Sequence, residues 1–145
     1  MGTSAACMWA TIYYAVHEMG VLIPDYTDSL LLFLRFIDDI IGIWIGSETD
    51  WISLKKDTNN FGILTWEFEE PTPSVTFLDL TISINNNYIT TQTYQKDLNL
   101  YQYITPRSNH PKTMMKGIIF SLLKTYKLQN TRTEDYHKMA VKLFN

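Results

Sequence analysis

The pattern of apolar and polar residues predicts an α+β fold, with strands in the middle of the chain and helices at both ends. Residues 4–19 are rich in Ala, Met, Trp and Tyr, and their apolar side chains are spread widely around a helical wheel. We therefore expect a helix that is buried on more than one face. Thr3 or Ser4 would cap it, Gly20 would end it, and residues 24–28 would form a loop.

Two short apolar runs, 30–36 and 40–45, are rich in branched and aromatic residues, which predicts two buried strands. Asp38 and Asp39 lie between the runs, so the strands would form a hairpin with adjacent carboxylates at its tip. The rest of the central region predicts a loop, a helix and three strands, at residues 46–50, 51–60, 64–68, 78–84 and 88–94. A turn is expected at residues 85–87, which are all Asn, because Asn tolerates positive φ.

After Pro106 the apolar residues recur at helical spacing. The expected core face consists of Met115, Ile118, Ile119, Leu122 and Tyr126. Lysines fall on an adjacent arc at about 100° per residue, namely Lys112, Lys116, Lys124 and Lys127. Thr131 and Glu134 have the spacing of a capping box, and a second amphipathic helix is predicted at 136–144.

Composition excludes several classes of protein. The chain has 145 residues, of which 46% are apolar and 19% charged, so it is long enough to bury a core. Its single cysteine excludes a disulfide framework and a cysteine-based zinc site. Charged residues interrupt every long apolar run, so no membrane-spanning helix is expected. We expect an intracellular protein without a membrane partner.

The net charge of −3 hides an asymmetry. Residues 1–90 carry −9 and residues 91–145 carry +6. One interpretation is an acidic half that holds cations and a basic half that faces phosphates. The simpler interpretation, two ordinary solvated surfaces, stays open.

Asp38 and Asp39 are the strongest candidates for chemistry. Adjacent carboxylates in an apolar stretch would repel each other and lose hydration, and a bound divalent cation would compensate for both effects. Hard oxygen ligands suit Mg²⁺ or Mn²⁺, although a further carboxylate would have to come from elsewhere in space. Asp79, expected within a strand, is a weaker candidate for that role. The alternative is a solvated turn, since Asp is a common turn residue.

Five blocks in order along the chain, at residues 1–6, 36–39, 77–80, 94–96 and 108–111, have the form of known sequence motifs. Residues 36–39, Phe-Ile-Asp-Asp, are similar to the aromatic-x-Asp-Asp motif of reverse transcriptases, and residues 1–6, Met-Gly-Thr-Ser-Ala-Ala, are similar to the block that precedes it. Downstream, residues 77–80 (Phe-Leu-Asp-Leu), 94–96 (Tyr-Gln-Lys) and 108–111 (Ser-Asn-His-Pro) resemble a pattern found in the polymerases of Penelope-like retroelements. The order and spacing of the blocks agree over nearly the whole chain.

The resemblance implies a partial right-hand polymerase palm at residues 1–105, made of antiparallel strands with packed helices, and the start of a helical thumb at 106–145. Asp38 and Asp39 would be the catalytic and metal-binding residues, with Asp38 the direct ligand of Mg²⁺ or Mn²⁺. The nucleotide and template pocket would include Gly2, Thr3 and Phe36. The nucleic-acid contacts would include Lys96, Lys112 and Lys116.

The implied activity is RNA-directed DNA synthesis, with an RNA template, a DNA primer and deoxynucleotides as partners, and with the nucleus as one open location. In that family another essential aspartate and the fingers precede the Gly-Thr block. We therefore expect a fragment or a degenerate copy that is inactive alone, and a separate chain carrying the upstream segment stays open as a partner. Two other interpretations stay open: a non-catalytic module that binds nucleic acid or protein, and an unrelated Mg²⁺-dependent phosphotransferase or nuclease.

Overall fold

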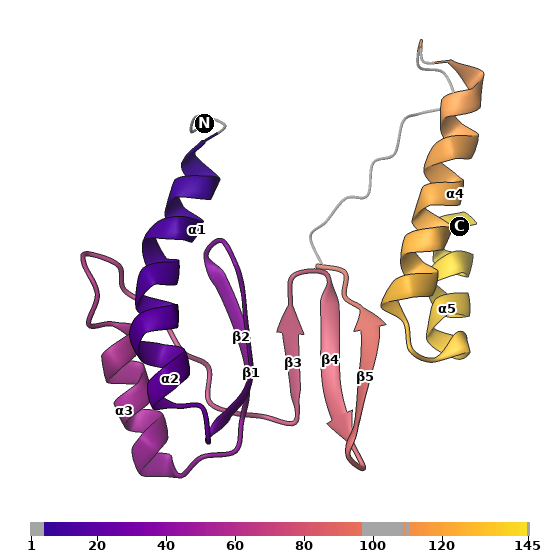
Figure 1. Cartoon of the computed structure of the whole chain (residues 1–145). Helices are drawn as coiled ribbons and strands as arrows, with labels where there is room; N and C mark the ends of the chain where they lie inside the picture. The colour runs from indigo at the N-terminus through magenta and orange to yellow at the C-terminus, as the bar shows by residue number, and fades with distance from the viewer. Residues whose placement is uncertain (1–4, 97–108, 110, 145) are drawn as a thin grey trace. The chain divides into compact units, whose positions relative to one another are not determined.

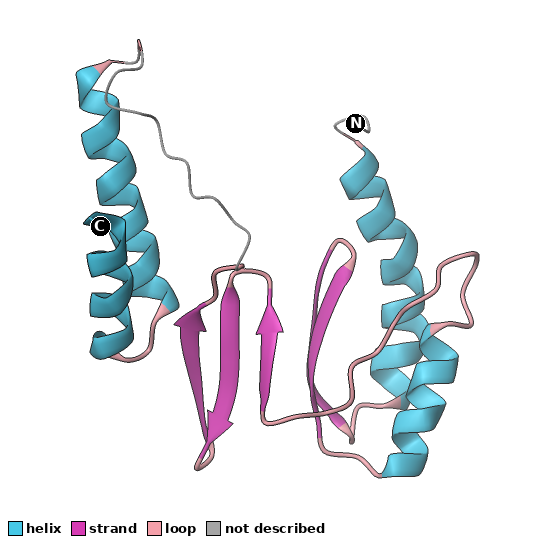
Figure 2. Cartoon of the chain, turned by 180° about the vertical axis from the view of Figure 1, so that it is seen from behind, coloured by secondary structure: helices cyan, strands magenta, loops and turns pink. Residues whose placement is uncertain are grey.

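The computed structural model describes residues 5–96, 109 and 111–144, and the chain divides into two compact units, Met1–Pro71 and Thr72–Asn145. Each unit combines helices with a small antiparallel sheet, which confirms the α+β class (Figures 1 and 2). The division after Pro71 differs from the boundary near residue 105 that the resemblance implies. Within the described residues, no helix is long and apolar enough to cross a membrane.

The first helix of unit 1 is longer than the sequence predicts. Helix α1 (Ala6–His17) continues into a π-helical segment, η1 (Glu18–Leu22), and then into α2 (Ile23–Asp25). The expectation that Gly20 ends the helix is therefore wrong, and part of the expected loop at 24–28 is helical. Leu22 is completely buried. Its packing carries the helix past the glycine, because tertiary contacts override local propensity.

Helix α1 buries one face rather than several. Tyr14 and His17 are buried, whereas Trp9 and Val16 are each 66% exposed. The expectation of burial on more than one face is therefore wrong. The expected caps, Thr3 and Ser4, lie outside the described residues.

The core of unit 1 lies between α1, η1 and helix α3 (Glu48–Thr58). Tyr14, Leu22 and Leu54 form its buried centre. Partly buried aromatic side chains surround that centre, among them Trp44, Trp51, Phe61 and Trp66. Helix α3 begins earlier than expected because Ser47 caps it, accepting a hydrogen bond from the Asp50 backbone N–H at 3.2 Å.

The strand expected at residues 64–68 does not form. Instead, the Asn59 side chain forms hydrogen bonds with both backbone polar groups of Trp66. Its Oδ1 accepts from the Trp66 N–H, and its Nδ2 donates to the Trp66 carbonyl at 3.2 Å. A side-chain amide thus satisfies the backbone groups that a neighbouring strand would otherwise satisfy. The Trp66 ring packs against Tyr14, with 4.9 Å between ring centroids.

Strands β1 (Leu30–Phe36) and β2 (Asp39–Trp44) form the predicted antiparallel hairpin in unit 1. The expectation that both strands are buried is wrong, since Leu31, Leu34 and Phe36 are each more than half exposed. A two-stranded sheet packs one face on the core of its unit, through Ile40 and Trp44.

Unit 2 contains a three-stranded antiparallel sheet in the order β3 (Ser74–Phe77), β4 (Leu80–Asn85) and β5 (Tyr88–Thr93). The Asn turn is confirmed, with positive φ at Asn86 and Asn87. Strand β3 was not expected, and Asp79 lies in the β3–β4 turn rather than in a strand. Because paired residues share a face, one face carries polar side chains, namely Ser74, Thr76, Thr81, Ser83, Thr90 and Gln92.

Helices α4 (Lys112–Gln129) and α5 (Thr133–Phe144) lie side by side, and the corner between them is bonded to the edge of β5 (Figures 1 and 2). Buried Asn130 accepts from the Thr93 N–H at 3.0 Å, while Thr131 accepts from the Thr91 N–H at 2.9 Å and donates its own N–H to the Thr91 carbonyl. The corner thereby pairs backbone groups of Thr91 and Thr93 at the edge of β5, where no further strand of the sheet lies. The expected capping box is wrong, since α5 begins two residues after Thr131 and the Thr131 hydroxyl bonds to β5.

We expect Tyr14→Phe to reduce the pH dependence of unfolding in alkaline solution. The Tyr14 hydroxyl donates to the Thr58 carbonyl at 2.8 Å, and burial is the main cause that raises its pKa to about 12. The folded-state pKa of Tyr14 lies above its ordinary value of about 10. The protonated hydroxyl therefore contributes its full share to the free energy of unfolding below pH ~10, and this contribution is lost as the pH rises through ~12. Urea unfolding at a series of pH values measures this loss in both proteins.

At pH 7 the Phe variant should be less stable by about 1 kcal/mol, the usual net contribution of one hydrogen bond. Stability curves for the two proteins that stay parallel from pH 9 to pH 12 would contradict this prediction.

Candidate metal centre at the β1–β2 hairpin

A two-residue turn joins β1 to β2. Phe36 pairs with Asp39, which leaves Ile37 and Asp38 as the two turn residues. Ile37 has a φ of +55°. A positive φ at the first turn position is typical of a type II′ turn, where glycine is the usual residue. An isoleucine in this region costs about 1–2 kcal/mol, so the surrounding contacts must hold the turn in place.

Unit 2 contains a second turn of the same kind. Phe77 pairs with Leu80, and Leu78, the first turn residue, has a φ of +54°. Both turns therefore have the order aromatic, aliphatic, aspartate: Phe-Ile-Asp at the first and Phe-Leu-Asp at the second. In both turns the second residue is therefore an aspartate, Asp38 in the first and Asp79 in the second. What distinguishes the first turn is the additional acid, Asp39.

Asp38 and Asp39 are both exposed, so the expected loss of hydration does not occur. The apolar runs that flank them in sequence become the two strands, and the hairpin carries the acids out to its tip. Asp38 lies in the turn, whereas Asp39 is the first residue of β2. Through the pairing of the strands, Asp39 shares the outer face of the hairpin with Phe36, beside Leu34 and Ile41.

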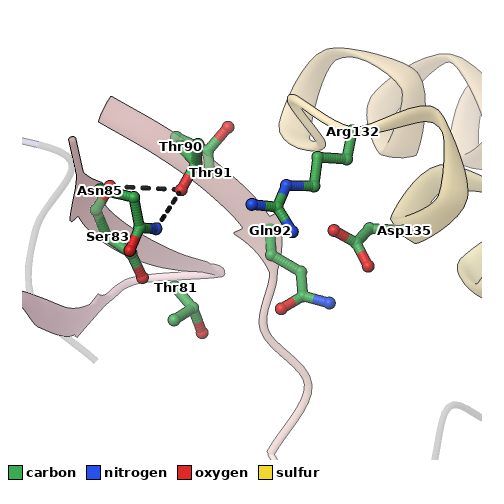
Figure 3. A pocket seen from close by; sticks show the side chains of 8 residues that line it. All are labelled: Thr81, Ser83, Asn85, Thr90, Thr91, Gln92, Arg132 and Asp135. Atoms are coloured by element: carbon green, nitrogen blue, oxygen red, sulfur yellow. Dashed lines mark hydrogen bonds between the residues drawn. The ribbon is translucent and has the colours of Figure 1, made fainter. Parts of the chain in front are cut away.

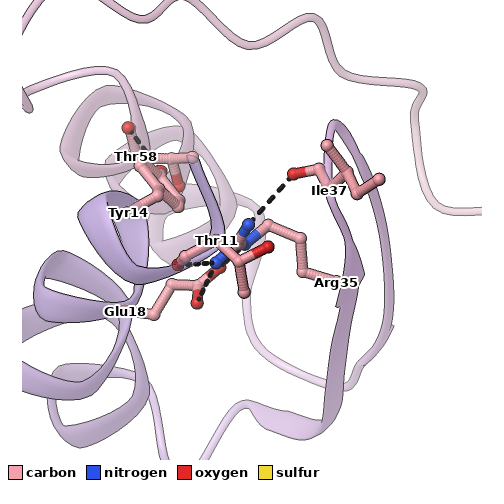
Figure 4. Close-up of polar contacts among 6 residues, drawn as sticks. All are labelled: Thr11, Tyr14, Glu18, Arg35, Ile37 and Thr58. Atoms are coloured by element: carbon pink, nitrogen blue, oxygen red, sulfur yellow. Dashed lines mark hydrogen bonds and ion pairs between the residues drawn. The ribbon is translucent and has the colours of Figure 1, made fainter. Parts of the chain in front are cut away.

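Arg35 connects the tip to the core of unit 1 (Figure 4). Its Nε bonds to Glu18 Oε1, and its Nη2 lies 3.1 Å from Glu18 Oε2. Nη1 donates to the Ile37 carbonyl at 3.0 Å, and Nη2 donates to the Thr11 carbonyl at 2.8 Å. The guanidinium also lies 5.5 Å from the centroid of the Tyr14 ring, which places it in cation–π range.

The other expected site residues lie in several parts of the chain. Phe36 is at the end of β1 and 54% exposed. Gly2 and Thr3 fall outside the described residues. Lys96 and Lys116 are exposed, and Lys112 is the first residue of α4.

A metal ion at the tip would have two carboxylates from the described part of the chain. No group of three or more His, Cys, Asp or Glu side chains among the described residues is arranged to hold a metal ion. Within the described residues of unit 1, no third carboxylate joins Asp38 and Asp39. Asp79 lies in unit 2. Two exposed carboxylates still form a hard-oxygen donor set. Mg²⁺ is commonly held by one or two carboxylates together with waters and substrate phosphates.

A polar hollow of about 140 Å³ lies in unit 2, between the polar face of the sheet and the α4–α5 corner (Figure 3). Hydroxyl and amide side chains of β4 and β5 line it together with Arg132 and Asp135. Local sequence patterns did not predict this hollow. Polar residues at every second position, Thr81 and Ser83 on one strand and Thr90 and Gln92 on the next, were the available signal for a polar sheet face. Nothing in the sequence indicated that Arg132 would lie next to it.

The charge asymmetry coincides with the two units. Unit 1 carries three basic and eleven acidic residues, and unit 2 carries nine basic and four acidic residues, so their net charges are −8 and +5. On α4 the predicted arrangement is confirmed: Met115, Ile118 and Leu122 are partly buried, whereas Lys116, Lys124 and Lys127 are exposed. The basic residues therefore form an accessible face on this helix.

Comparison with known proteins identified no relative: no family model, curated protein or solved structure matches the chain.

The Glu18–Arg35 pair was not predicted from the sequence either. Two features could have indicated it. Arg35 is the one basic residue within residues 1–54, and it falls in an apolar strand next to the paired acids. A charge in such a strand needs a partner when its side chain turns inward.

We expect the usual order of stability of glycine and alanine variants to be reversed at position 37. Ile37→Gly should be more stable than Ile37→Ala by about 1 kcal/mol, because glycine adopts positive φ without strain. Both variants remove the side chain beyond Cβ, so the comparison isolates the backbone. Urea unfolding of the two variants measures the difference.

Ile63 provides the control, because it is 96% exposed and its φ is not positive. There the Ala variant should be at least as stable as the Gly variant. The same order of stability at both positions would argue against strain at Ile37.

Proposed function

We propose that this chain is part of an RNA-directed DNA polymerase of the retroelement type and that the β1–β2 hairpin is its metal-binding element for nucleotidyl transfer. The observation that supports this proposal best is the strand–turn–strand around Phe36, Ile37, Asp38 and Asp39, which has adjacent acids at an exposed tip. The resemblance of these residues to the aromatic-x-Asp-Asp motif gives that hairpin a chemical role.

The residues at the tip suit Mg²⁺ or Mn²⁺ in their donor chemistry. Asp38 would be the direct ligand and Asp39 would assist. When bound, such a cation stabilises the charge that develops on the oxygens of an in-line phosphoryl transfer. The chain's own residues hold the two carboxylates at the exposed tip of the hairpin, where phosphates of a nucleotide can reach them. Phe36, paired with Asp39, adds an exposed aromatic surface next to the acids.

Unit 2 supports the same proposal through its charge. Its net charge is +5, and α4 presents exposed lysines that suit the phosphate backbone of a duplex. The side chains proposed for this contact, those of Lys96, Lys112 and Lys116, recognise charge rather than sequence. That is appropriate for an enzyme that copies any template.

The chain is expected not to extend a primer by itself. The described residues of unit 1 bring two carboxylates to the tip. The resemblance implies a further essential aspartate, and we propose that another segment supplies it. Extension of a DNA primer on an RNA template by the purified chain in Mg²⁺ would contradict this part of the proposal.

A second candidate function is a binding module without catalysis. The observation in its favour is the Phe-Leu-Asp turn of unit 2, which has the same backbone conformation and carries one acid. If Asp38 serves only the turn, then the hairpin holds no cation and the basic face of α4 is the functional surface. The two turns therefore provide a matched pair of positions for separating the two functions.

We expect Asp38→Asn to weaken Mn²⁺ binding by at least about tenfold, the lower end of losses seen when a metal site is altered. Asp39→Asn should weaken binding to a smaller extent. Asp79→Asn should bind Mn²⁺ as the wild type does, since it changes the same turn position away from the paired acids. The Mn²⁺ affinity of the wild type and of the three variants is measured by titration, with electron paramagnetic resonance reporting the free Mn²⁺. Equal affinities in the Asp38 and Asp79 variants would favour the non-catalytic module.

We expect Lys116→Ala to weaken binding of a short RNA–DNA hybrid and to lower the slope of log K against log salt by about 1, as for a single phosphate contact. Lys138→Ala is the control, because it removes the same charge from a lysine that already pairs with Asp135 at 3.1 Å. Fluorescence anisotropy over a range of salt concentrations measures both variants. An identical change in the two variants would indicate a general charge effect rather than a contact on α4.

A further inference from the structure

Arg35 lies where the candidate site meets the core of unit 1. It is the residue before Phe36 on β1, but its side chain lies on the opposite face from the exposed Leu34 and Phe36 and is 5% exposed. Its contacts reach two elements: Glu18 and the Thr11 carbonyl on the helix, and the Ile37 carbonyl in the turn. One guanidinium thus joins the helix to the tip of the hairpin (Figure 4).

The turn needs such a contact. Ile37 has a positive φ, and the first position of this turn is usually filled by glycine. A strained conformation persists only where surrounding contacts over-determine it. The hydrogen bond from Arg35 to the Ile37 carbonyl acts directly on the peptide unit between Ile37 and Asp38, so it orients the backbone that carries the first acid.

Glu18 is suited to hold this arginine in place. Its side chain is 10% exposed, and it is the first residue of the π-helical segment η1. Both of its carboxylate oxygens face Arg35, which gives the pair fork-to-fork geometry. A lysine could not reproduce this arrangement, because an ammonium group lacks the planar set of donors that reaches Glu18, Thr11 and Ile37 together.

We propose that Arg35, held by Glu18, is a positioning residue that fixes the strained Ile37–Asp38 turn and so holds Asp38 and Asp39 ready for a divalent cation. This inference rests on the proposed function for its metal, but it makes a separate claim about the backbone. The hydrogen bonds of the Arg35 side chain go to Glu18, Thr11 and Ile37 rather than to either acid, so Arg35 would act through the Ile37 carbonyl.

The test uses the full chain and the variants Arg35→Lys and Glu18→Gln, with Mn²⁺ as the probe. Both variants should keep the helical circular dichroism of the wild type. Their Mn²⁺ dissociation constants should rise at least threefold. The three-bond HN–Hα coupling and the 13Cα shift of Ile37 should move away from wild-type values, because they report φ directly and need no metal.

A third variant provides the rescue. Glycine at position 37 adopts the turn without strain, so Arg35 should matter less there. The loss of Mn²⁺ affinity caused by Arg35→Lys should therefore be smaller in the Ile37→Gly background than in the wild type. If the Arg35–Glu18 pair only stabilised the fold of unit 1 as a whole, Arg35→Lys would cause the same loss of Mn²⁺ affinity in both backgrounds, and the positioning role would be overturned.

The outcomes separate this inference from the proposed function. If the wild type and Asp38→Asn bind Mn²⁺ equally, the metal role fails, while the Ile37 coupling still decides whether Arg35 sets the turn. If Asp38→Asn loses binding but Arg35→Lys and Glu18→Gln bind as the wild type does, the positioning role is overturned and the metal site stands. If both pair variants unfold, the positioning role is also overturned, because the pair then serves the whole unit.

Discussion

The ion pair between Arg35 and Glu18 is the contact on which the orientation of the β1–β2 tip depends. A two-stranded hairpin is marginally stable by itself, and the β1–β2 turn carries a strained Ile37. The pair connects that turn to the helix with charge-assisted hydrogen bonds at a site that is almost fully buried. Loss of one partner would leave the other charge buried and uncompensated, which is far more costly than loss of an exposed pair. The orientation of the acidic tip is therefore linked to the core.

The two hairpins of the chain show how one local pattern can serve two purposes. An aromatic residue, an aliphatic residue and an aspartate form the same turn in unit 1 and in unit 2. In unit 2 the turn connects strands of a sheet whose far edge is satisfied by Asn130 and Thr131. In unit 1 it is followed by a second acid, in a unit with a net charge of −8. The turn alone therefore assigns no function, and the case for a cation rests on the pair of acids.

Local patterns predicted most of the elements, because their signals act over a few residues. The β1–β2 hairpin, the Asn turn and the lysine-bearing face of α4 were all predicted from alternation or helical spacing. The errors came where a distant side chain decided the outcome. Buried Leu22 carried the first helix past Gly20, and the amide of Asn59 bonded to Trp66 where a strand was expected. Thr131 bonded to β5 rather than capping a helix. The burial of the hairpin was overestimated because an apolar strand can belong to a sheet with one open face.

The order of residues by itself determined the α+β class, the turn that presents Asp38 and Asp39, and the separation of acidic and basic residues, since each follows from neighbours within a few positions. The tertiary structure decided that the acids lie in water at a tip and that Arg35 meets Glu18, seventeen positions away. It also decided that the helix corner closes the edge of β5. The physical reason is that burial, ion pairing and hydrogen bonding at a strand edge depend on which segments come together in space. A local sequence pattern does not predict which segments those are.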